Sequence, residues 1–312
     1  MCVFVILTNT PAPVYQLGNL FDMRHLILLL AIPLWLSVTG YGPAIQAAKP
    51  VQLSTIADRP DTARRLVWAD EFNMDGKPSA RNWTFEHGFV RNHELQWYQP
   101  ENARCENGLL VIEGRREQRP NPTYKPNSSD WKTNRPTVNY TAASLKTQGL
   151  HSWQYGRFEM RGRIDIRPGM WPAFWTLGVA GNWPSNGEID IMEYYRNQLL
   201  ANVAWGTAKP SVAEWRTTRK PIDSLNDPDW PKKFHVWRMD WDKTTIQLYV
   251  DGQLLTKVDL KETVNKDGSN LNPFHQPHYL LLNLAIGGDN GGDPSATSFP
   301  SRLEVDYVRV YQ

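Results

Sequence analysis

Three carboxylates lie within the six residues 188–193, whose sequence is Glu-Ile-Asp-Ile-Met-Glu. The segment is otherwise apolar and predicts a buried strand. Side chains of a strand alternate between its two faces, so Glu188 and Asp190 share one face and the isoleucines share the other. Strict alternation would put Glu193 with the isoleucines. We therefore expect a β-bulge near Met192 that returns Glu193 to the carboxylate face.

Two neighbouring carboxyl groups are the machinery of glycoside hydrolysis, in which retaining enzymes hold them about 5–5.5 Å apart. A strand rises about 3.3 Å per residue, so the backbones of Glu188 and Glu193 should lie on the order of 13 Å apart. Their side chains would then have to lean toward each other on a curved strand. The competing interpretation is a solvated face with three acids, which the repulsion between like charges disfavours.

Aromatic residues surround this acidic segment on both sides. Residues 171–175 are Trp-Pro-Ala-Phe-Trp, Trp183 precedes a proline, and Tyr194, Tyr195 and Trp205 follow. Flat aromatic faces pack against the C–H faces of pyranose rings, so the combination predicts a cleft for a sugar polymer. Core packing is the competing interpretation for these tryptophans.

The elements that carry the acids follow from the rest of the pattern. Many short strands, frequent Gly, Pro and Asn turns and few helical periodicities predict an all-β, two-sheet sandwich. Residues 245–250 and 253–255 flank Asp251-Gly252 and predict a hairpin, and residues 279–286 predict a fully buried strand. Residues 114–139 and 207–232 are polar or proline-rich, so we expect surface loops that could wall the cleft.

Residues 187–193 (Gly-Glu-Ile-Asp-Ile-Met-Glu) and 169–175 (Gly-Met-Trp-Pro-Ala-Phe-Trp) together resemble glycoside hydrolase family 16, and within it the laminarinase-like endo-β-1,3-glucanases. The strands expected at 66–72 and 305–311 resemble the opening and closing strands of that family, so the resemblance covers about residues 66–312. It implies a β-jelly roll of two antiparallel sheets with the acidic strand on the concave face. It also implies retention of configuration, without a cofactor.

The resemblance assigns roles to individual residues. Glu188 is implied as the nucleophile, Glu193 as the acid/base, and Asp190 as the group that orients the nucleophile. Other positions are implied or expected to bind substrate: Asn92, on the non-reducing side of the cut, and the cleft aromatics Trp171, Trp175, Trp183 and Trp205. The strand at 199–206 lacks a histidine that relatives often carry, and the loop at 287–294 lacks a Trp-Pro, which leaves one sugar subsite undefined.

Two further assignments concern Arg157 and a metal. Arg157 and Glu159 share a face of the strand expected at 155–161, so Arg157 either lines the cleft or forms a structural ion pair with Glu159. The resemblance implies a structural Ca²⁺ on the convex face, held by Glu71, the Gly108 carbonyl and Asp306. Oxygen ligands suit Ca²⁺, but so few would need waters to complete the shell.

Residues 1–47 predict a targeting segment. A short positive start at Met23-Arg24-His25 precedes an apolar run at 26–38 and small residues before a cleavage site after Ala47 or Ala48. Translation would then start at Met23. A retained membrane anchor is the alternative, but the run is short for a span. Residues 48–65 form a lead-in, and residues 66–312 the catalytic domain. We expect a monomer that is secreted, periplasmic or on the cell surface.

Composition and missing motifs exclude several other functions. The net charge of +2 gives no argument for nucleic-acid binding, and 14 tryptophans fit carbohydrate recognition. Neither a Gly-x-Ser-x-Gly elbow nor a Gly-rich phosphate loop is present. Two alternatives stay open: a same-fold hydrolase or transglycosylase for another polysaccharide, such as mixed-linkage glucan or a marine galactan, and a non-catalytic glycan-binding protein. The second would typically lack one catalytic glutamate.

Overall fold

The computed structural model describes residues 64–312. The targeting segment predicted at 1–47, the alternative start at Met23 and nearly all of the lead-in at 48–65 lie outside the described residues.

Two β-sheets account for most of the described chain. The larger sheet has ten strands in the order β15-β14-β13-β8-β17-β5-β6-β3, with β1 paired to β17 and β4 paired to β5. Its strands are β1 (Leu66–Asp70), β3 (Gln96–Tyr98), β4 (Ala103–Glu106), β5 (Leu109–Pro120), β6 (Thr137–Ala142), β8 (Gly156–Ile164), β13 (His235–Trp241), β14 (Thr245–Val250), β15 (Gln253–Asp259) and β17 (Ser301–Tyr311).

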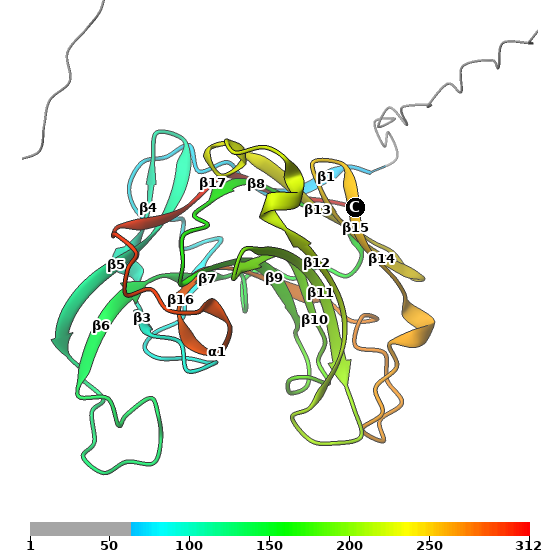
Figure 1. Cartoon of the computed structure of the whole chain (residues 1–312). Helices are drawn as coiled ribbons and strands as arrows, with labels where there is room; N and C mark the ends of the chain where they lie inside the picture. Colours follow the sequence, from blue (N-terminus) through cyan, green and yellow to red (C-terminus); the bar gives the residue numbers. More distant parts are fainter. Residues whose placement is uncertain (1–63) are drawn as a thin grey trace, which may run out of the picture. The chain divides into compact units, whose positions relative to one another are not determined.

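The smaller sheet has seven strands in the order β12-β11-β10-β9-β16-β7-β2. Its strands are β2 (Thr84–Phe85), β7 (Ser144–Lys146), β9 (Met170–Gly178), β10 (Glu188–Tyr195), β11 (Gln198–Gly206), β12 (Ala213–Pro221) and β16 (His278–Ile286). Figure 1 shows β8, β13 and β17 in one layer and β7, β9 and β16 in the layer beneath. The pairings are antiparallel as predicted, except that β3 and β6 run parallel.

The core lies between the two sheets. Ile189 and Ile191 of β10 and Phe158 and Met160 of β8 belong to one buried cluster. On β8, buried and half-buried residues alternate, as period two requires for a strand with one face on the core. On β16, by contrast, all nine residues are buried, because both faces of this central strand are covered. Each fully buried Ile or Phe contributes about 1.5–3 kcal/mol.

Helices are few and short in residues 64–312. They are the 3₁₀ turns η1 (Pro100–Asn102), η2 (Ile222–Leu225), η3 (Trp230–Lys232) and η4 (Leu260–Glu262) and the single α-helical turn α1 (Gly288–Gly291). In this part of the chain no helix has the length and apolar character needed to cross a bilayer.

The hairpin at β14–β15 and the buried strand β16 confirm the sequence predictions. The two long loops were predicted too long. Residues 213–221 form β12, and β5 and β6 leave only residues 121–136 as the loop that Figure 1 shows extending beyond them. Because β12 is an edge strand with both faces largely exposed, its residues are polar and show no apolar alternation.

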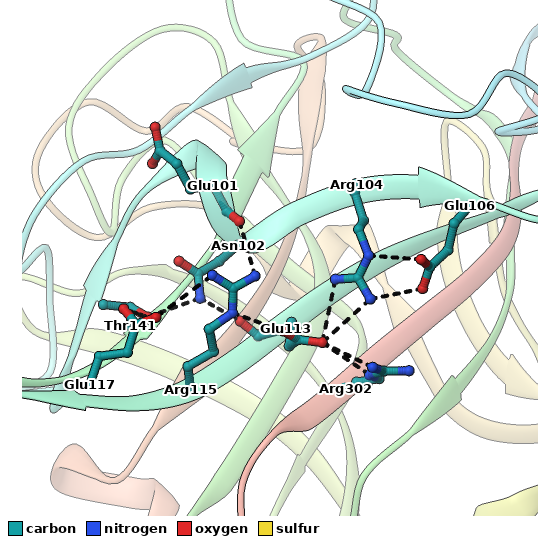
Figure 2. A network of polar contacts seen from close by, with 9 residues as sticks. All are labelled: Glu101, Asn102, Arg104, Glu106, Glu113, Arg115, Glu117, Thr141 and Arg302. Atoms are coloured by element: carbon teal, nitrogen blue, oxygen red, sulfur yellow. Dashed lines mark hydrogen bonds and ion pairs between the residues drawn. The ribbon is translucent and has the colours of Figure 1, made fainter.

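A network of polar side chains ties strands β4, β5 and β17 of the larger sheet and the turn η1 together (Figure 2). Glu113 of β5 is its centre and receives hydrogen bonds from Arg115 at 2.8 Å, Arg302 at 3.1 Å and Arg104 at 3.3 Å. Asn102 adds a bond from its side chain to the Glu113 carbonyl at 2.7 Å. Burial alone would raise the pKa of Glu113, but the arginines offset it and lower that pKa. This carboxylate is therefore held in its charged form.

Candidate active site

The β-bulge predicted in the acidic segment is present. In the pairing of β10 with β9, Asp190 lies opposite Trp175 and Glu193 opposite Ala173, while Ile191 and Met192 together fill the space of one partner residue. Both of these bulge residues are buried in the core. Glu193 consequently returns to the face that carries Glu188 and Asp190, as the prediction required.

The three acids open into a cavity of about 720 Å³ on the outer face of the seven-stranded sheet. This volume is in the range of sites that bind small ligands or a segment of a polymer. The lining residues are Arg91, Asn92, Glu94, Trp171, Ala173, Trp175, Leu177, Trp183, Glu188, Asp190, Glu193, Tyr195, Asn202, Trp215, Thr217, Arg219, Asn283 and Asn290.

A larger hollow of about 1220 Å³ lies beside this cavity, between loop segments 180–185, 207–211 and 260–276. Trp183 lines both spaces. The larger hollow contains none of the three acids, so chemistry belongs to the smaller one.

A chain of hydrogen bonds from neutral donors holds the acids. The Trp183 indole N–H donates to Glu188 Oε2 at 2.6 Å. The Trp171 indole N–H donates to Glu193 Oε1, also at 2.6 Å. Between them the Asn202 side-chain amide donates to Asp190 Oδ2 at 2.9 Å and to Glu193 Oε2 at 2.8 Å. These bonds join Asp190 to Glu193 through Asn202 and hold Glu188 and Glu193 each on a tryptophan.

Burial raises the pKa of each acid. It brings the pKa of Glu193 to about 8. It brings that of Glu188 to about 7, although the Trp183 hydrogen bond acts in the opposite direction. A hydrogen bond between Asp190 and Glu188 raises the pKa of Asp190 and lowers that of Glu188. Asp190 therefore keeps its proton and donates it toward the Glu188 carboxylate.

The surroundings distinguish the three acids further. Asp190 is almost completely buried, whereas Glu188 and Glu193 keep some surface open to the cavity. Water at that surface moderates the effect of burial on the two glutamates. The site thus offers one carboxylic acid able to donate a proton near neutral pH and one carboxylate held in place for attack. These are the two groups that displacement at a sugar carbon requires.

The family profile for "Glycosyl hydrolases family 16" matches residues 105–309, about two thirds of the chain. The chain belongs to glycosyl hydrolase family 16. It is accordingly a glycoside hydrolase, and the three acids just described lie within the matched region.

Two curated relatives of this family 16 protein have names that identify them as glucan-degrading enzymes. A Beta-glucanase of Rhodothermus marinus is 37% identical over 275 residues, which are 82% of this chain and 88% of the relative. Glucan endo-1,3-beta-glucosidase A1 of Niallia circulans is 30% identical over 293 residues, covering 86% of this chain. This second match spans only 41% of the relative's length.

Solved structures agree with the family assignment. The laminarinase catalytic domain from Thermotoga maritima is 34% identical, has a TM-score of 0.66, and aligns over 80% of this chain and 98% of its own. A structure from work on endo-acting O-glycanases of human gut microbiota has a TM-score of 0.73 at 34% identity, covering 81% and 92%. The predicted jelly roll is therefore confirmed.

Most substrate-binding residues predicted for this family 16 site line the cavity. Trp183 is 42% exposed, whereas Trp171 and Trp175 are 5% and 7% exposed. Trp175 donates its indole N–H to Asn283 at 2.7 Å and carries the Arg91 guanidinium over its ring, so it lies between core and cavity. Asn92 adopts a left-handed backbone with φ 56° and lines the opposite part of the cavity from β12.

Two predicted substrate residues lie elsewhere, and these predictions were wrong. Trp205 is 2% exposed and belongs to the core, because it points to the opposite face of β11 from Asn202. Arg157 lies on β8 of the other sheet, where its Nε is 2.8 Å from Asp240 Oδ1. Of the two roles considered for Arg157 the structural one is correct, but Asp240 is its main partner, with Glu159 at 4.0 Å.

The loop at 121–136 does not line the cavity, contrary to expectation. Arg135 near its end donates to the backbone carbonyls of Glu94 at 2.8 Å and His93 at 3.0 Å. The loop therefore supports the segment that carries Asn92 rather than forming a wall itself.

Several cavity residues were not predicted. Glu94 is buried, receives hydrogen bonds from Gln96 at 2.6 Å and Asn92 at 3.3 Å, and has a pKa raised by burial. Its position two residues after Asn92 was the available signal. Asn202 was recognisable only from its pairing with Asp190. Trp215, Thr217 and Arg219 were hidden by the interpretation of 207–232 as a loop.

The groups implied as calcium ligands do not fit a Ca²⁺ site as they lie. The Glu71 carboxylate accepts hydrogen bonds from Nε and Nη2 of Arg309, at 2.7 and 2.8 Å. Asp306 Oδ2 accepts a hydrogen bond from Arg161 Nη1 at 2.5 Å. In residues 64–312 no group of three or more acidic, His or Cys side chains is arranged to hold a metal. Each carboxylate that the resemblance implied is thus already neutralised by an arginine, and Ca²⁺ binding remains an untested prediction.

Proposed function

We propose that this protein is a retaining endo-glucanase that cleaves internal β-1,3 or mixed β-1,3/1,4 bonds of laminarin-type glucans. One observation carries the proposal: Trp183 holds Glu188, and Asn202 joins Asp190 to Glu193, on the face of β10 that opens into the cavity. The names of the relatives from Rhodothermus marinus and Niallia circulans and of the Thermotoga maritima structure support β-1,3-glucan as the substrate class.

In the first step Glu193 donates its proton to the glycosidic oxygen while the Glu188 carboxylate attacks the anomeric carbon. The bond between that carbon and the leaving oxygen breaks, and a glycosyl ester of Glu188 forms. The raised pKa of Glu193 keeps the proton available near neutral pH. Protonated Asp190 holds the attacking carboxylate by its hydrogen bond.

In the second step Glu193, now a carboxylate, removes a proton from water. The water oxygen attacks the anomeric carbon and Glu188 leaves as a carboxylate, so two inversions give net retention. The indole of Trp171 and the amide of Asn202 both donate to Glu193, which stabilises its charged form between the steps.

The test is release of reducing ends by residues 48–312 from laminarin, lichenan, agarose and carrageenan, compared with Glu188→Gln. We expect release from laminarin and a nearly complete loss in the variant, because an amide cannot form the ester intermediate. Unchanged thermal unfolding of the variant shows that the fold is intact. Near-normal turnover by a folded Glu188→Gln protein would contradict the assigned nucleophile.

A second candidate is a same-fold hydrolase of another glycan. It is favoured by the TM-score of 0.73 to the structure from work on mucin-degrading endo-acting O-glycanases, which exceeds that to the laminarinase domain. Release only from agarose, carrageenan or mucin-type glycans would keep the mechanism and change the substrate. A glycan-binding protein without activity is disfavoured because both glutamates and Asp190 are retained.

We further propose that the protein is exported and acts as a monomer. The targeting segment at 1–47 supports export. Mass spectrometry of protein recovered from the medium or periplasm should find a chain that begins near residue 48. A chain that keeps residues 23–47 in the membrane fraction would favour the anchor instead, and light scattering would test the monomer.

A further inference from the structure

The edge strand β12 presents three successive side chains to the active-site cavity. Trp215, Thr217 and Arg219 line it. The residues that alternate with them bond to other elements: Arg216 to Glu262, Thr218 to the Leu255 carbonyl, and Lys220, after Arg219, to Gln253. Those partners belong to β15 and η4. The alternation therefore fixes one face of β12 on the cavity, although the sequence of the strand shows no apolar pattern.

The register of the sheet aligns this face with the catalytic acids. Ala204 of β11 pairs with Glu188 on one side and with Trp215 on the other. Neighbouring strands lie about 4.8 Å apart, so Trp215 is anchored roughly 10 Å from the proposed nucleophile strand. Ala204 has only a methyl group, so no bulky side chain from β11 stands between Glu188 and Trp215. A polymer lying across the strands would pass from one to the other.

Trp215 is as exposed as Trp183 and much more exposed than the other two tryptophans of the cavity. Its side chain is 43% exposed, whereas those of Trp171 and Trp175 are nearly buried. An exposed indole leaves apolar surface hydrated, so covering it with a ligand is favourable. Its flat face suits the C–H face of a pyranose ring.

Hydrogen-bonding groups lie along the same strand. Thr217 offers a hydroxyl in the row of Asp190 and Asn202. Arg219 lies in the row of Glu193, and its side chain bonds to Tyr195 beside that acid. An apolar platform next to a hydroxyl and a guanidinium is suited to a ring with one apolar face and equatorial hydroxyls.

We propose that Trp215 binds a glycosyl unit of the polymer beyond the one being cleaved, on the side of the acids away from Asn92. The strand order places β12 on one side of β10 and β16 on the other. Asn92 belongs to the β16 side, since Leu95 donates its N–H to the Ile286 carbonyl at 2.9 Å. Trp215 is then a specificity-determining residue that makes long chains better substrates than short ones. This inference rests on the proposed function of the same site.

The experiment compares Trp215→Ala, Trp215→Phe and the control Leu254→Ala on β-1,3-gluco-oligosaccharides of increasing length. Leu254 is an equally exposed apolar residue on β15 outside the cavity. For Trp215→Ala we expect KM to rise about tenfold, which corresponds to about 1.4 kcal/mol, only for chains long enough to reach β12. The kcat should be unchanged, because the contact is the same in ground and transition states. Trp215→Phe should retain part of the effect, and Leu254→Ala should match the wild type.

Two results would overturn this proposal. One is wild-type KM at every chain length in Trp215→Ala. The other is an equal loss at all lengths together with a lower melting temperature, which indicates a structural role. An inactive wild type would contradict the proposed function instead. In that case oligosaccharide binding by Glu188→Gln, with and without Trp215→Ala, still tests the platform by calorimetry, and equal affinities would reject it.

Discussion

Glu113 and Glu193 are both partly enclosed glutamates on β-strands, yet their surroundings shift their pKa values in opposite directions. Around Glu113 the hydrogen-bond donors are arginines, and its pKa is lowered. Around Glu193 the donors are an indole and an amide, and burial raises its pKa to about 8. Even Arg91, one of the two arginines that line the cavity, is bound by Glu86.

The difference shows how one residue type can be structural on one sheet and reactive on the other. A charged partner satisfies a carboxylate and removes its tendency to take up a proton. A neutral N–H fixes the same group in space but leaves that tendency in place. Each of the following experiments tests either a carboxylate that arginines bind or a carboxyl group that neutral donors hold.

The largest effect is expected for Glu193→Gln. Loss of the proton donor should lower kcat on laminarin by about 10²–10⁴-fold, the usual contribution of general acid catalysis. An oligosaccharide with an aryl leaving group that needs no proton should lose much less in the first step. Equal losses on both substrates, measured by burst kinetics, would contradict the acid role.

The pH profile of kcat/KM should be bell-shaped. Activity should fall below about pH 7, where Glu188 is protonated, and above about pH 8, where Glu193 has lost its proton. Trp171→Phe removes a donor that favours the charged form of Glu193, so its pKa should rise and the alkaline limb should move upward. Trp183→Phe should move the acidic limb upward for the same reason. Limbs that stay in place in both variants would contradict the assignment.

The two glutamates should respond oppositely to pH in unfolding experiments. Glu113→Gln should lower the free energy of unfolding by about 1–3 kcal/mol at pH 7, since several partly exposed arginines lose their partner. A lowered folded-state pKa gives stability that is present above the unfolded pKa and lost as pH falls, so the deficit should shrink near pH 4.

Glu193 has a raised folded-state pKa. Between the unfolded value and about 8 the folded state binds more protons than the unfolded chain, so stability falls as pH rises. Glu193→Gln should therefore gain stability relative to the wild type as pH rises to 8. Urea unfolding of the Glu113→Gln variant at pH 4 and 7, and of the Glu193→Gln variant at pH 5 and 8, checks the two signs, and parallel pH dependences would break the comparison.

The smallest effect is expected for metal removal. Glu71 and Asp306 are neutralised by Arg309 and Arg161, in the manner of Glu113. The fold as described has no carboxylate there that needs Ca²⁺, so EDTA should leave the melting temperature unchanged. A drop that added Ca²⁺ reverses would restore the implied metal and require both arginines to move.

The acids and their bulge could be predicted from the sequence because alternation of period two and a spacing of Glu-x-Asp-x-x-Glu are local properties. Which face of a strand meets the cavity is not a local property of its sequence, because it depends on the strands that pair with it. Trp205 and Arg157 were placed in the cleft for that reason: their own strands were recognised, but the partner across each strand was not. A pairing register, as between Asp190 and Asn202, is needed to decide such cases.

The edge strand β12 was missed for a different physical reason. Its residues are exposed on both faces, so burial imposes no pattern that a sequence could display. Its hydrogen bonds to β11 alone define it as a strand. The part of the site that we propose to select chain length is therefore the part least visible in the sequence.

The bulge at Ile191 and Met192 adds one residue to β10 and so changes the face on which each later side chain lies. Every side chain after it is shifted by one face: Glu193 and Tyr195 enter the cavity, and Tyr194 enters the core. Deleting either bulge residue would exchange all three positions at once and place the acid in the interior. The geometry of this catalytic pair thus depends on the number of residues in β10. Once a bulge residue is deleted, no substitution of a side chain can restore that number.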